Sequence, residues 1–199
     1  LIAEAEANPV PPETPADAKG HWAEKTIHAF MKLQVLKGYP DGTAKPNQAI
    51  TRAEFVTVLS RLIDVSGTQA ARLRDVDGHW AHTAIEKFAA AGIIGGYGDG
   101  TFRPDRAISR EEMILVLSRI VDLEAAARDG GGSDPEFADI GGSHAGEAIR
   151  AAARAGIVSG RSPDNRFDPG ASATRAEALT VILNMLNLSP DLQKLLATL

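Results

Sequence analysis

The sequence predicts an all-α fold made of three helix–loop–helix repeats, and two observations lead to this prediction. Three stretches, residues 20–65, 78–123 and 142–188, contain the same parts in the same order. Within each stretch, two segments with apolar residues three to four positions apart flank a loop rich in glycine, proline and aspartate. One such unit has too little apolar area to fold alone, so the three repeats are expected to pack together.

The repeats divide the chain into six segments. These are a lead-in linker (1–16), repeat 1 (17–66), repeat 2 (73–124), a glycine-rich linker (125–136), repeat 3 (137–188) and a C-terminal helical tail (189–199). The first residues show no signal peptide and read as the end of an upstream segment. We therefore expect a processed or excised piece of a larger protein, with a cargo region upstream.

The first helix of each repeat is clearest in repeat 2. Ile85, Phe88 and Ala89 form one apolar stripe at helical spacing. Gly92 is the expected C-terminal stop, because glycine readily takes the left-handed conformation that ends many helices. Gly156 stands at the matching place in repeat 3.

The second helix of each repeat is expected to begin at a capping box. In this motif a hydroxyl at the N-cap accepts from a backbone N–H, and a carboxylate three residues later accepts from the N–H of the N-cap. Capping explains these glutamates better than glycoside hydrolysis by paired carboxylates, since each repeat supplies only one. The predicted pairs are Thr51 with Glu54, Ser109 with Glu112, and Thr174 with Glu177.

Composition excludes several classes of function. A net charge of −5 argues against general binding of nucleic acid or anionic membranes, although 21 Lys and Arg leave room for a local site for an acidic ligand. The absence of cysteine excludes a thiolate metal site and a cysteine nucleophile. No apolar run approaches the roughly 18 residues that would suggest membrane insertion. The histidines lack metal-ligand spacing, and the glycine-rich loops offer one carboxylate where calcium needs several. We expect no metal, no cofactor and no catalytic residues.

The order of the motifs resembles the S-layer homology repeat, and three in a row resembles the usual tandem of that family. Repeat 2 has the fullest set, and most of its parts recur in the other two repeats. It contains Asp75-Val76, His79-Trp80, Gly96-Tyr97-Gly98-Asp99-Gly100-Thr101-Phe102-Arg103-Pro104 and Ile108-Ser109-Arg110-Glu111-Glu112.

The resemblance implies a fold, a ligand and a location. The three repeats would form a pseudo-threefold trimer, with one helix of each joining a central three-helix bundle. Grooves between repeats would bind a secondary cell-wall polymer linked to peptidoglycan, through its pyruvylated N-acetylmannosamine unit. The chain would then be a secreted, non-covalent anchor at the S-layer or cell wall of a Gram-positive bacterium.

Arg52, Arg110 and Arg175 are the first candidates for ligand contact, because the family's Thr-Arg-Ala-Glu binding motif maps onto them. Each is expected at the first position of its helix, where the side chain can point out of the fold. A guanidinium there could bind the carboxylate of a pyruvate ketal through two hydrogen bonds. The alternative is a solvated or internally paired arginine. A cation near a helix N-terminus is slightly unfavourable, so three such placements favour a use beyond stability.

Two tryptophans and several loop residues are further candidates for ligand binding. Trp22 and Trp80 could stack on a sugar face or lie half-buried between repeats, and the sequence does not decide between these. The loop glycines could serve tight turns and let the backbone approach a ligand closely. The loop residues expected near the ligand are Gly38, Gly96, Tyr97 and Gly98.

The third repeat departs from the pattern, so its site is expected to be weaker. His144 replaces tryptophan, residues 159–163 replace the open glycine stretch, and the loop is one residue longer than in repeat 2. The site that uses Arg175 is therefore predicted to be the weakest, unless Arg161 compensates as a second cation. Repeat 1 also departs, because it lacks an Asp-Val pair at its start.

A carbohydrate-binding anchor is the preferred function. The same grooves could instead hold a peptide or a neighbouring subunit, which would make the chain a helical module for protein–protein assembly at the cell surface. An enzyme is a distant third, since the sequence shows neither a nucleotide-binding glycine motif nor local support for a catalytic triad.

Overall fold

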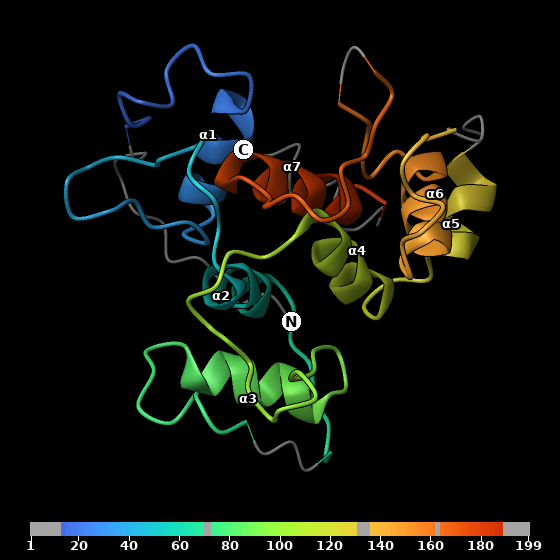
Figure 1. Ribbon diagram of the computed structural model, residues 1–199. Helices are drawn as coiled ribbons and strands as arrows, with labels where there is room; N and C mark the ends of the chain where they lie inside the picture. Colours follow the sequence, from blue (N-terminus) through green and yellow to red (C-terminus); the bar gives the residue numbers. More distant parts are fainter. Residues whose placement is uncertain (1–12, 70–72, 131–135, 162–163, 189–199) are drawn as a thin grey trace.

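The computed structural model describes residues 13–69, 73–130, 136–161 and 164–188, and this part of the chain is helical (Figure 1). In these ranges the extended backbone forms isolated bridges and no sheet. The all-α prediction is confirmed. The helices are α1 (Glu24–Lys32), α2 (Arg52–Leu62), α3 (His82–Ala90), α4 (Arg110–Ser118), α5 (Leu123–Gly130), α6 (Gly146–Arg154) and α7 (Arg175–Leu186).

Helices α2, α4 and α7 each begin at a complete capping box, as predicted. In α2, Thr51 Oγ1 accepts from the N–H of Glu54 at 3.1 Å, and Glu54 Oε2 accepts from the N–H of Thr51 at 2.9 Å. The same pair of bonds starts α4 and α7. The hydroxyl and the carboxylate thus fix where each of these helices starts.

The first helices of the repeats end at a left-handed residue. Gly92 follows α3 with φ 72° and Gly156 follows α6 with φ 73°, so both predicted stops are confirmed. After Gly92 the chain turns back, and the N–H of Ile93 donates to the carbonyl of Phe88 at 3.0 Å. Repeat 1 uses Gln34 at this place with φ 56°, a conformation that costs a non-glycine residue roughly 1–2 kcal/mol.

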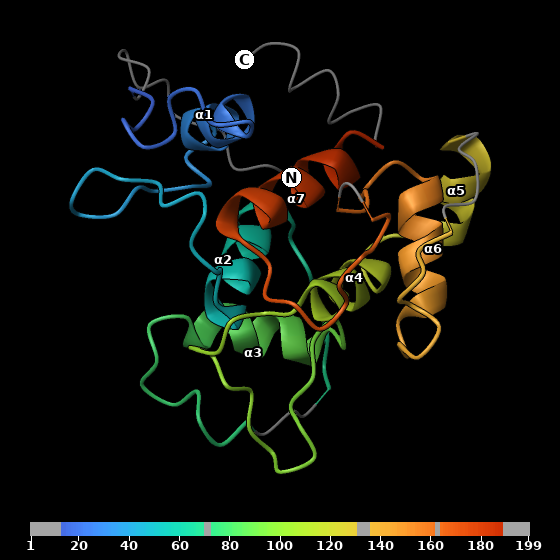
Figure 2. The same ribbon diagram turned by 45° about the horizontal axis from the view of Figure 1, so that its top comes forward.

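Each capped helix packs against the first helix of the following repeat. Helix α2 contacts α3, α4 contacts α6, and α7 returns to contact α1. Figures 1 and 2 show α2, α4 and α7 in the middle of the molecule and α1, α3 and α6 outside them. The hydrophobic core is therefore shared between repeats instead of being enclosed within each one.

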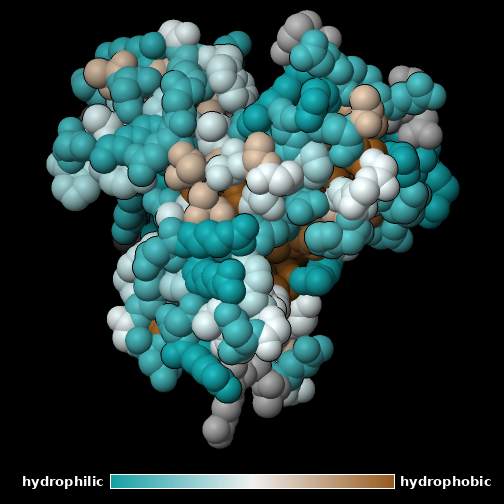
Figure 3. All heavy atoms as spheres, in the orientation of Figure 1, coloured by the Kyte–Doolittle hydropathy of each residue, from teal (hydrophilic) through white to brown (hydrophobic). Residues whose placement is uncertain are grey.

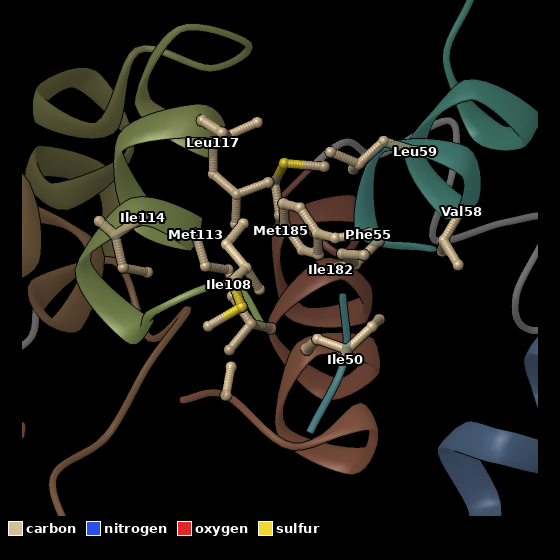
Figure 4. Close-up of a cluster of buried hydrophobic side chains, with 14 of the residues drawn as sticks. Ile50, Phe55, Val58, Leu59, Ile108, Met113, Ile114, Leu117, Ile182 and Met185 are labelled. Carbon is tan, nitrogen blue, oxygen red and sulfur yellow. The ribbon is translucent and has the colours of Figure 1, made fainter. Parts of the chain in front are cut away.

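Side chains from α2, α4 and α7 meet in one buried cluster (Figure 4). Phe55, Met113 and Ile182 are among its fully buried members, one from each helix. In Figure 3 the visible face is mostly hydrophilic, and hydrophobic residues show chiefly in the hollow where the parts of the molecule meet. The apolar stripes predicted on the second helices thus point to a common interior.

A closed ring of backbone hydrogen bonds links the three repeats beside this cluster. The N–H of Ile50 donates to the carbonyl of Ala173, that of Ala173 to Ile108, and that of Ile108 to Ile50, each at 3.0 Å. All three residues are buried. Buried backbone groups need such partners, and here each repeat obtains them from another repeat.

One predicted boundary needs correction, and other predictions lie outside the described residues. Residues 125–130, assigned to the glycine-rich linker, belong to α5, which packs against α6. Asp122 Oδ1 accepts from the N–H of Ala125 at 2.9 Å at the start of this helix. The run Glu-Ala-Ala-Ala-Arg after Leu123 is a strong helix former and could have indicated it. Residues 1–12, 131–135 and 189–199, including the predicted tail, are not described. No helix in the described ranges is both long and apolar enough to span a bilayer.

We expect that repeat 2, expressed alone as residues 73–124, does not fold. Its helices α3 and α4 pack against α2 and α6 from other repeats, so excision exposes both apolar faces. Circular dichroism of the excised repeat should show little helix. The whole chain should be strongly helical and unfold in one transition with urea. A stable, helical single repeat released by limited proteolysis would contradict this arrangement.

Candidate functional site

The three motif arginines reach into the loop of the following repeat. Arg52 Nε donates to the carbonyl of Phe102 at 2.8 Å, and Arg110 Nε donates to that of Phe167 at 2.7 Å. Arg175 closes the cycle by donating to Ala44 in repeat 1 at 3.0 Å. With only 4–8% of their surface exposed, the arginines do not point out of the fold. That expectation was wrong, because a side chain at the start of each helix faces a neighbouring repeat instead of solvent.

Each arginine also pairs with the capping glutamate of the following repeat. Arg110 Nη1 lies 2.9 Å from Glu177 Oε1, and the other two arginines pair in the same way with Glu112 and Glu54. The glutamate therefore caps its helix through Oε2 and holds an arginine through Oε1. Internal pairing, the alternative left open by the sequence, explains the position of these arginines. A cation at the helix start is offset by a carboxylate of the next repeat.

The first backbone N–H groups of the capped helices are likewise occupied. In α4 the N–H of Arg110 donates to Ala171 and that of Glu111 to Pro169, both at 2.9 Å. The equivalent bonds of α2 and α7 run to repeats 2 and 1. Together with the capping box, they satisfy the N–H groups that a helix N-terminus normally leaves free. These helix starts therefore serve assembly of the repeats and are not open anion sites.

The loop between the helices is fixed by aspartates. Asp99 Oδ1 accepts from the N–H and the hydroxyl of Thr101, at 3.0 and 2.6 Å, and Asp99 also pairs with Arg103. Asp75 accepts the N–H groups of Phe102 and Arg103, both at 2.7 Å. Among the described residues, no three His, Asp or Glu side chains gather as a metal site would require.

Repeat 1 also has an aspartate whose carboxylate accepts two consecutive loop N–H groups, as Asp75 does in repeat 2, although it lacks the Asp-Val pair. We call this arrangement the aspartate clamp. Asp17 accepts the N–H groups of Ala44 and Lys45, at 2.9 and 2.7 Å. A signal for this residue was present, because an aspartate stands five positions before tryptophan in both repeats 1 and 2. In each repeat the clamp holds a residue with positive φ directly before a proline, as at Lys45 with φ 49°.

The predicted loop glycines play different parts. A Cβ at Gly96 would lie 2.7 Å from Leu73 Cδ2 and 2.8 Å from the carbonyl oxygen of Thr101. At Gly38 the nearest atom, the carbonyl oxygen of Thr43, would be 3.3 Å away, whereas Gly98 has open space. Gly96 is thus required by packing inside the protein, and of these three only Gly98 leaves room for a ligand.

Tyr97 faces the buried ion pair, and the third repeat has an arginine in its place. The hydroxyl of Tyr97 donates to Glu112 Oε1 at 2.7 Å, as that of Tyr39 does to Glu54 at 2.9 Å. In repeat 3, Arg161 Nη2 donates to Glu177 Oε1 at 3.0 Å. Arg161 thus lies beside Arg110 and Glu177, and not beside Arg175, whose site it was expected to support.

Trp22 and Trp80 are the most exposed large hydrophobic side chains of the described residues, at 64% and 63%. A half-buried wedge between repeats is excluded, so both rings are accessible for stacking. The preceding histidines act as local caps, because His21 Nδ1 and His79 Nδ1 each accept a backbone N–H at 3.1 Å. The second tryptophan and its histidine thus repeat the geometry of the first.

One surface groove of about 410 Å³ brings residues of all three repeats together. Trp22 comes from repeat 1, Arg110 from repeat 2, and Arg161 and Glu177 from repeat 3. A larger hollow of about 520 Å³, between the end of α4 and α6, contains none of the residues predicted for the site. We take the groove as the candidate site because it holds an exposed aromatic ring beside two cations.

A buried hydroxyl in this groove lacks a partner. Thr180 Oγ1 lies in the wall of the groove and has no hydrogen-bond partner in the structure. Thr57 at the equivalent place of α2 is also unpaired. An unsatisfied buried hydroxyl normally costs stability, but less than 1 Å² of this oxygen is accessible, so it is not a contact for a ligand in the groove. No sequence pattern marks this residue, since a helical threonine looks the same whether or not it is paired.

The loop residues in which repeat 3 differs from the other repeats do not contact Arg175. The loop at 159–161 contacts Arg110, whose Nη2 donates to the carbonyl of Ser159 at 3.3 Å. Arg175 instead lies in the loop of repeat 1, with its guanidinium 4.8 Å from the ring of Tyr39. The physical reason given for a weak Arg175 site was therefore wrong, because each arginine serves the loop of the next repeat.

Comparison with protein families gives one match, in three parts. The model for the S-layer homology domain matches residues 16–56, 72–114 and 136–179. These ranges contain the three loops and the three capped helix starts described above. The match therefore covers the loops and helix starts through which each repeat contacts the next and repeat 3 contacts repeat 1.

Three curated relatives illustrate the kinds of protein that contain similar segments. An amylopullulanase of Thermoanaerobacterium thermosulfurigenes is 33% identical over 180 residues, which cover 88% of this chain and 10% of that protein. A cellulosome-anchoring protein of Acetivibrio thermocellus is 39% identical over 126 residues, 60% of this chain and 27% of the relative. An S-layer protein of Bacillus licheniformis is 27% identical over 173 residues, 86% and 19% respectively. The chain thus spans well under two thirds of each relative.

We expect Arg110→Ala to lower the free energy of unfolding by about 3 kcal/mol. The substitution leaves buried carbonyls unpaired and removes one partner of a buried ion pair. Urea denaturation measures the loss, with Arg103→Ala as an exposed control that should change stability by less than about 0.5 kcal/mol. Equal, small effects of the two substitutions would show that the buried arginine is not needed for assembly.

We also expect the protein to lose stability in acid through Glu177. Burial disfavours its charged form, but hydrogen bonds from Thr174 and Arg161 and the nearby Arg110 outweigh this and lower the pKa of Glu177 below 4.5. Its stabilising effect is therefore complete above about pH 4.5 and is lost as the pH falls through the lowered pKa.

Glu177→Gln tests this, because glutamine can still cap the helix but carries no charge. The variant should be less stable than wild type at pH 7, and the difference should shrink towards pH 3. Glu147→Gln, at an exposed position, serves as the control. A difference that stays constant with pH would contradict a role for the carboxylate charge.

Proposed function

The chain belongs to the S-layer homology domain family, and on this premise we propose that its grooves bind a secondary cell-wall polymer linked to peptidoglycan. Members of this family are non-catalytic anchoring modules of bacterial cell-surface and S-layer proteins. Enzymes among the relatives, such as the amylopullulanase, share only their S-layer homology part with this chain. What we add is the ligand and the place where it binds.

The groove at Trp22 is the observation that carries this proposal. An exposed indole ring offers an apolar face for a pyranose ring, and it lines the same groove as the partly exposed guanidinium of Arg161. Two guanidinium groups, of Arg110 and Arg161, and the carboxylate of Glu177 line the groove, and Asp168 beside it pairs with Arg161 at 3.4 Å. This combination suits an acidic sugar, although the whole chain carries a net charge of −5.

We propose pyruvylated N-acetylmannosamine as the recognised unit. Its ketal retains one carboxylate on a sugar ring, and an arginine can bind a carboxylate through two hydrogen bonds. The buried motif arginines would act mainly by charge from beneath the groove. The more exposed cations beside them would make the direct contact.

The other two arginine sites should differ from this groove. The Arg52 site has a second cation, because Arg106 lies 2.9 Å from Glu112. It lacks the tryptophan, because His144 stands at that position before the neighbouring helix α6. Around Arg175 the position equivalent to Arg106 is Gln48, so that site lacks the second cation. We therefore still propose that the Arg175 site is the weakest, now because Gln48 and Tyr39 stand where Arg106 and Arg161 place a second cation beside the capping glutamate in the other sites.

The architecture implied by the family is also part of the proposal. We propose that the repeats form a pseudo-threefold trimer with α2, α4 and α7 as its central three-helix bundle. The closed backbone ring at Ile50, Ile108 and Ala173 supports it, as does the buried cluster to which these helices contribute (Figure 4). In this arrangement each groove lies at a junction between repeats.

Binding to cell-wall sacculi tests the function. The chain should bind sacculi that retain their secondary polymer and should not bind sacculi from which acid extraction has removed it. Trp22→Ala should weaken binding roughly tenfold, which corresponds to about 1.4 kcal/mol, without loss of fold because the ring is exposed. Arg150→Ala, at a partly exposed position on α6 outside the groove, is the control. Equal binding to extracted sacculi would refute the polymer as ligand and favour peptide or subunit recognition.

A further inference from the structure

We infer that Arg161 is the residue that makes the Trp22 groove select a carboxylate-bearing sugar over a neutral one. This inference rests on the proposed function and deepens it, because it assigns the charge specificity of one groove to one side chain. The residue lies outside the Thr-Arg-Ala-Glu motif. Its role follows from its position, its charge and its exposure.

Arg161 occupies the position that tyrosine holds in the other two repeats. The N–H of Tyr97 donates to the carbonyl of Thr101 at 2.7 Å, and the N–H of Arg161 donates to that of Arg166, also at 2.7 Å. Both side chains then reach the capping glutamate of their own repeat. A cation thus replaces a neutral phenol at the same point of the fold.

Arg161 places a second cation beside the capping glutamate of repeat 3, which has no arginine at the position of Arg106. In repeat 2 the second cation is Arg106, whose carbonyl accepts from the start of α2. The residue that accepts from the start of α4 in the same way is Ala171. Arg161 therefore supplies, from the opposite side of the loop, the positive charge that alanine cannot.

Exposure distinguishes Arg161 from the motif arginine beside it. Both guanidinium groups lie against Glu177 Oε1, with nitrogen–oxygen distances of 2.9 Å for Arg110 and 3.0 Å for Arg161. The side chain of Arg110 is 5% exposed and donates to two loop carbonyls, whereas that of Arg161 is 38% exposed. The bond from Arg161 to Asp168 is long, at 3.4 Å. Arg161 is thus the cation that a ligand in the groove can reach.

The groove offers two kinds of contact to one ligand. Trp22 provides an apolar face, and Arg161 a guanidinium with five N–H groups in a planar fork. A sugar ring with one carboxylate matches both. A neutral sugar would match the indole face but offers no anion to the guanidinium.

A tryptophan fluorescence titration isolates this groove. The chain has two tryptophans, so Trp80→Phe leaves Trp22 as the only reporter. In this background, pyruvylated N-acetylmannosamine should bind at least about tenfold more tightly than N-acetylmannosamine, as expected for a charge-assisted pair. Arg161→Tyr should remove most of this preference, chiefly by weakening the binding of the pyruvylated sugar.

Tyrosine is a conservative test, because repeats 1 and 2 fold with it at this position. Arg161→Lys, which keeps the charge, should retain part of the preference, and Arg166→Gln in the same loop should retain all of it. If Trp22 responds to neither sugar in the Trp80→Phe background, the proposed function and this inference are overturned together. A clear response with the same preference in Arg161→Tyr would overturn the inference alone.

Discussion

The structure depends on one constraint, which is that the start of each capped helix is completed by the next repeat. The ring formed by Ile50, Ile108 and Ala173 lies at the centre of this arrangement. Around this ring, the first backbone N–H groups and the arginine of each capped helix bond to the loop and the capping glutamate of the next repeat. Because buried polar groups must be paired, a repeat that moves away leaves several of them without partners at once. The three units therefore form one cooperative structure.

This constraint explains why the residues of the site are also residues of the scaffold. Glu177 caps α7 and also holds two guanidinium groups, so the cations of the groove are held in place by the same carboxylate that starts a scaffold helix. Only side chains on the rim, such as Trp22 and Arg161, are free to differ without disturbing the core. Variation at the rim can thus change the ligand while the family motif, which is buried, stays constant.

The sequence was sufficient to predict the local structure and part of the site. The helix starts, the stops at Gly92 and Gly156 and the all-α class follow from short-range rules, and all were found. The exposure of Arg110 could not be predicted, because it depends on which loop the side chain meets across the repeat boundary. Asp17 and α5, in contrast, had signals in the sequence that a stricter alignment of the repeats or attention to helix propensity would have found.

The cyclic order of the contacts has a consequence for the connectivity of the chain. Repeat 3 contacts repeat 1 through the same bonds that join repeats 1 and 2, although no linker connects them directly. The covalent order is therefore incidental to the closed assembly. A circularly permuted gene that begins at repeat 2 and joins repeat 3 to repeat 1 would encode the same set of contacts. Such rearrangement, or exchange of single repeats between paralogues, offers evolution a route to new groove combinations without a new fold.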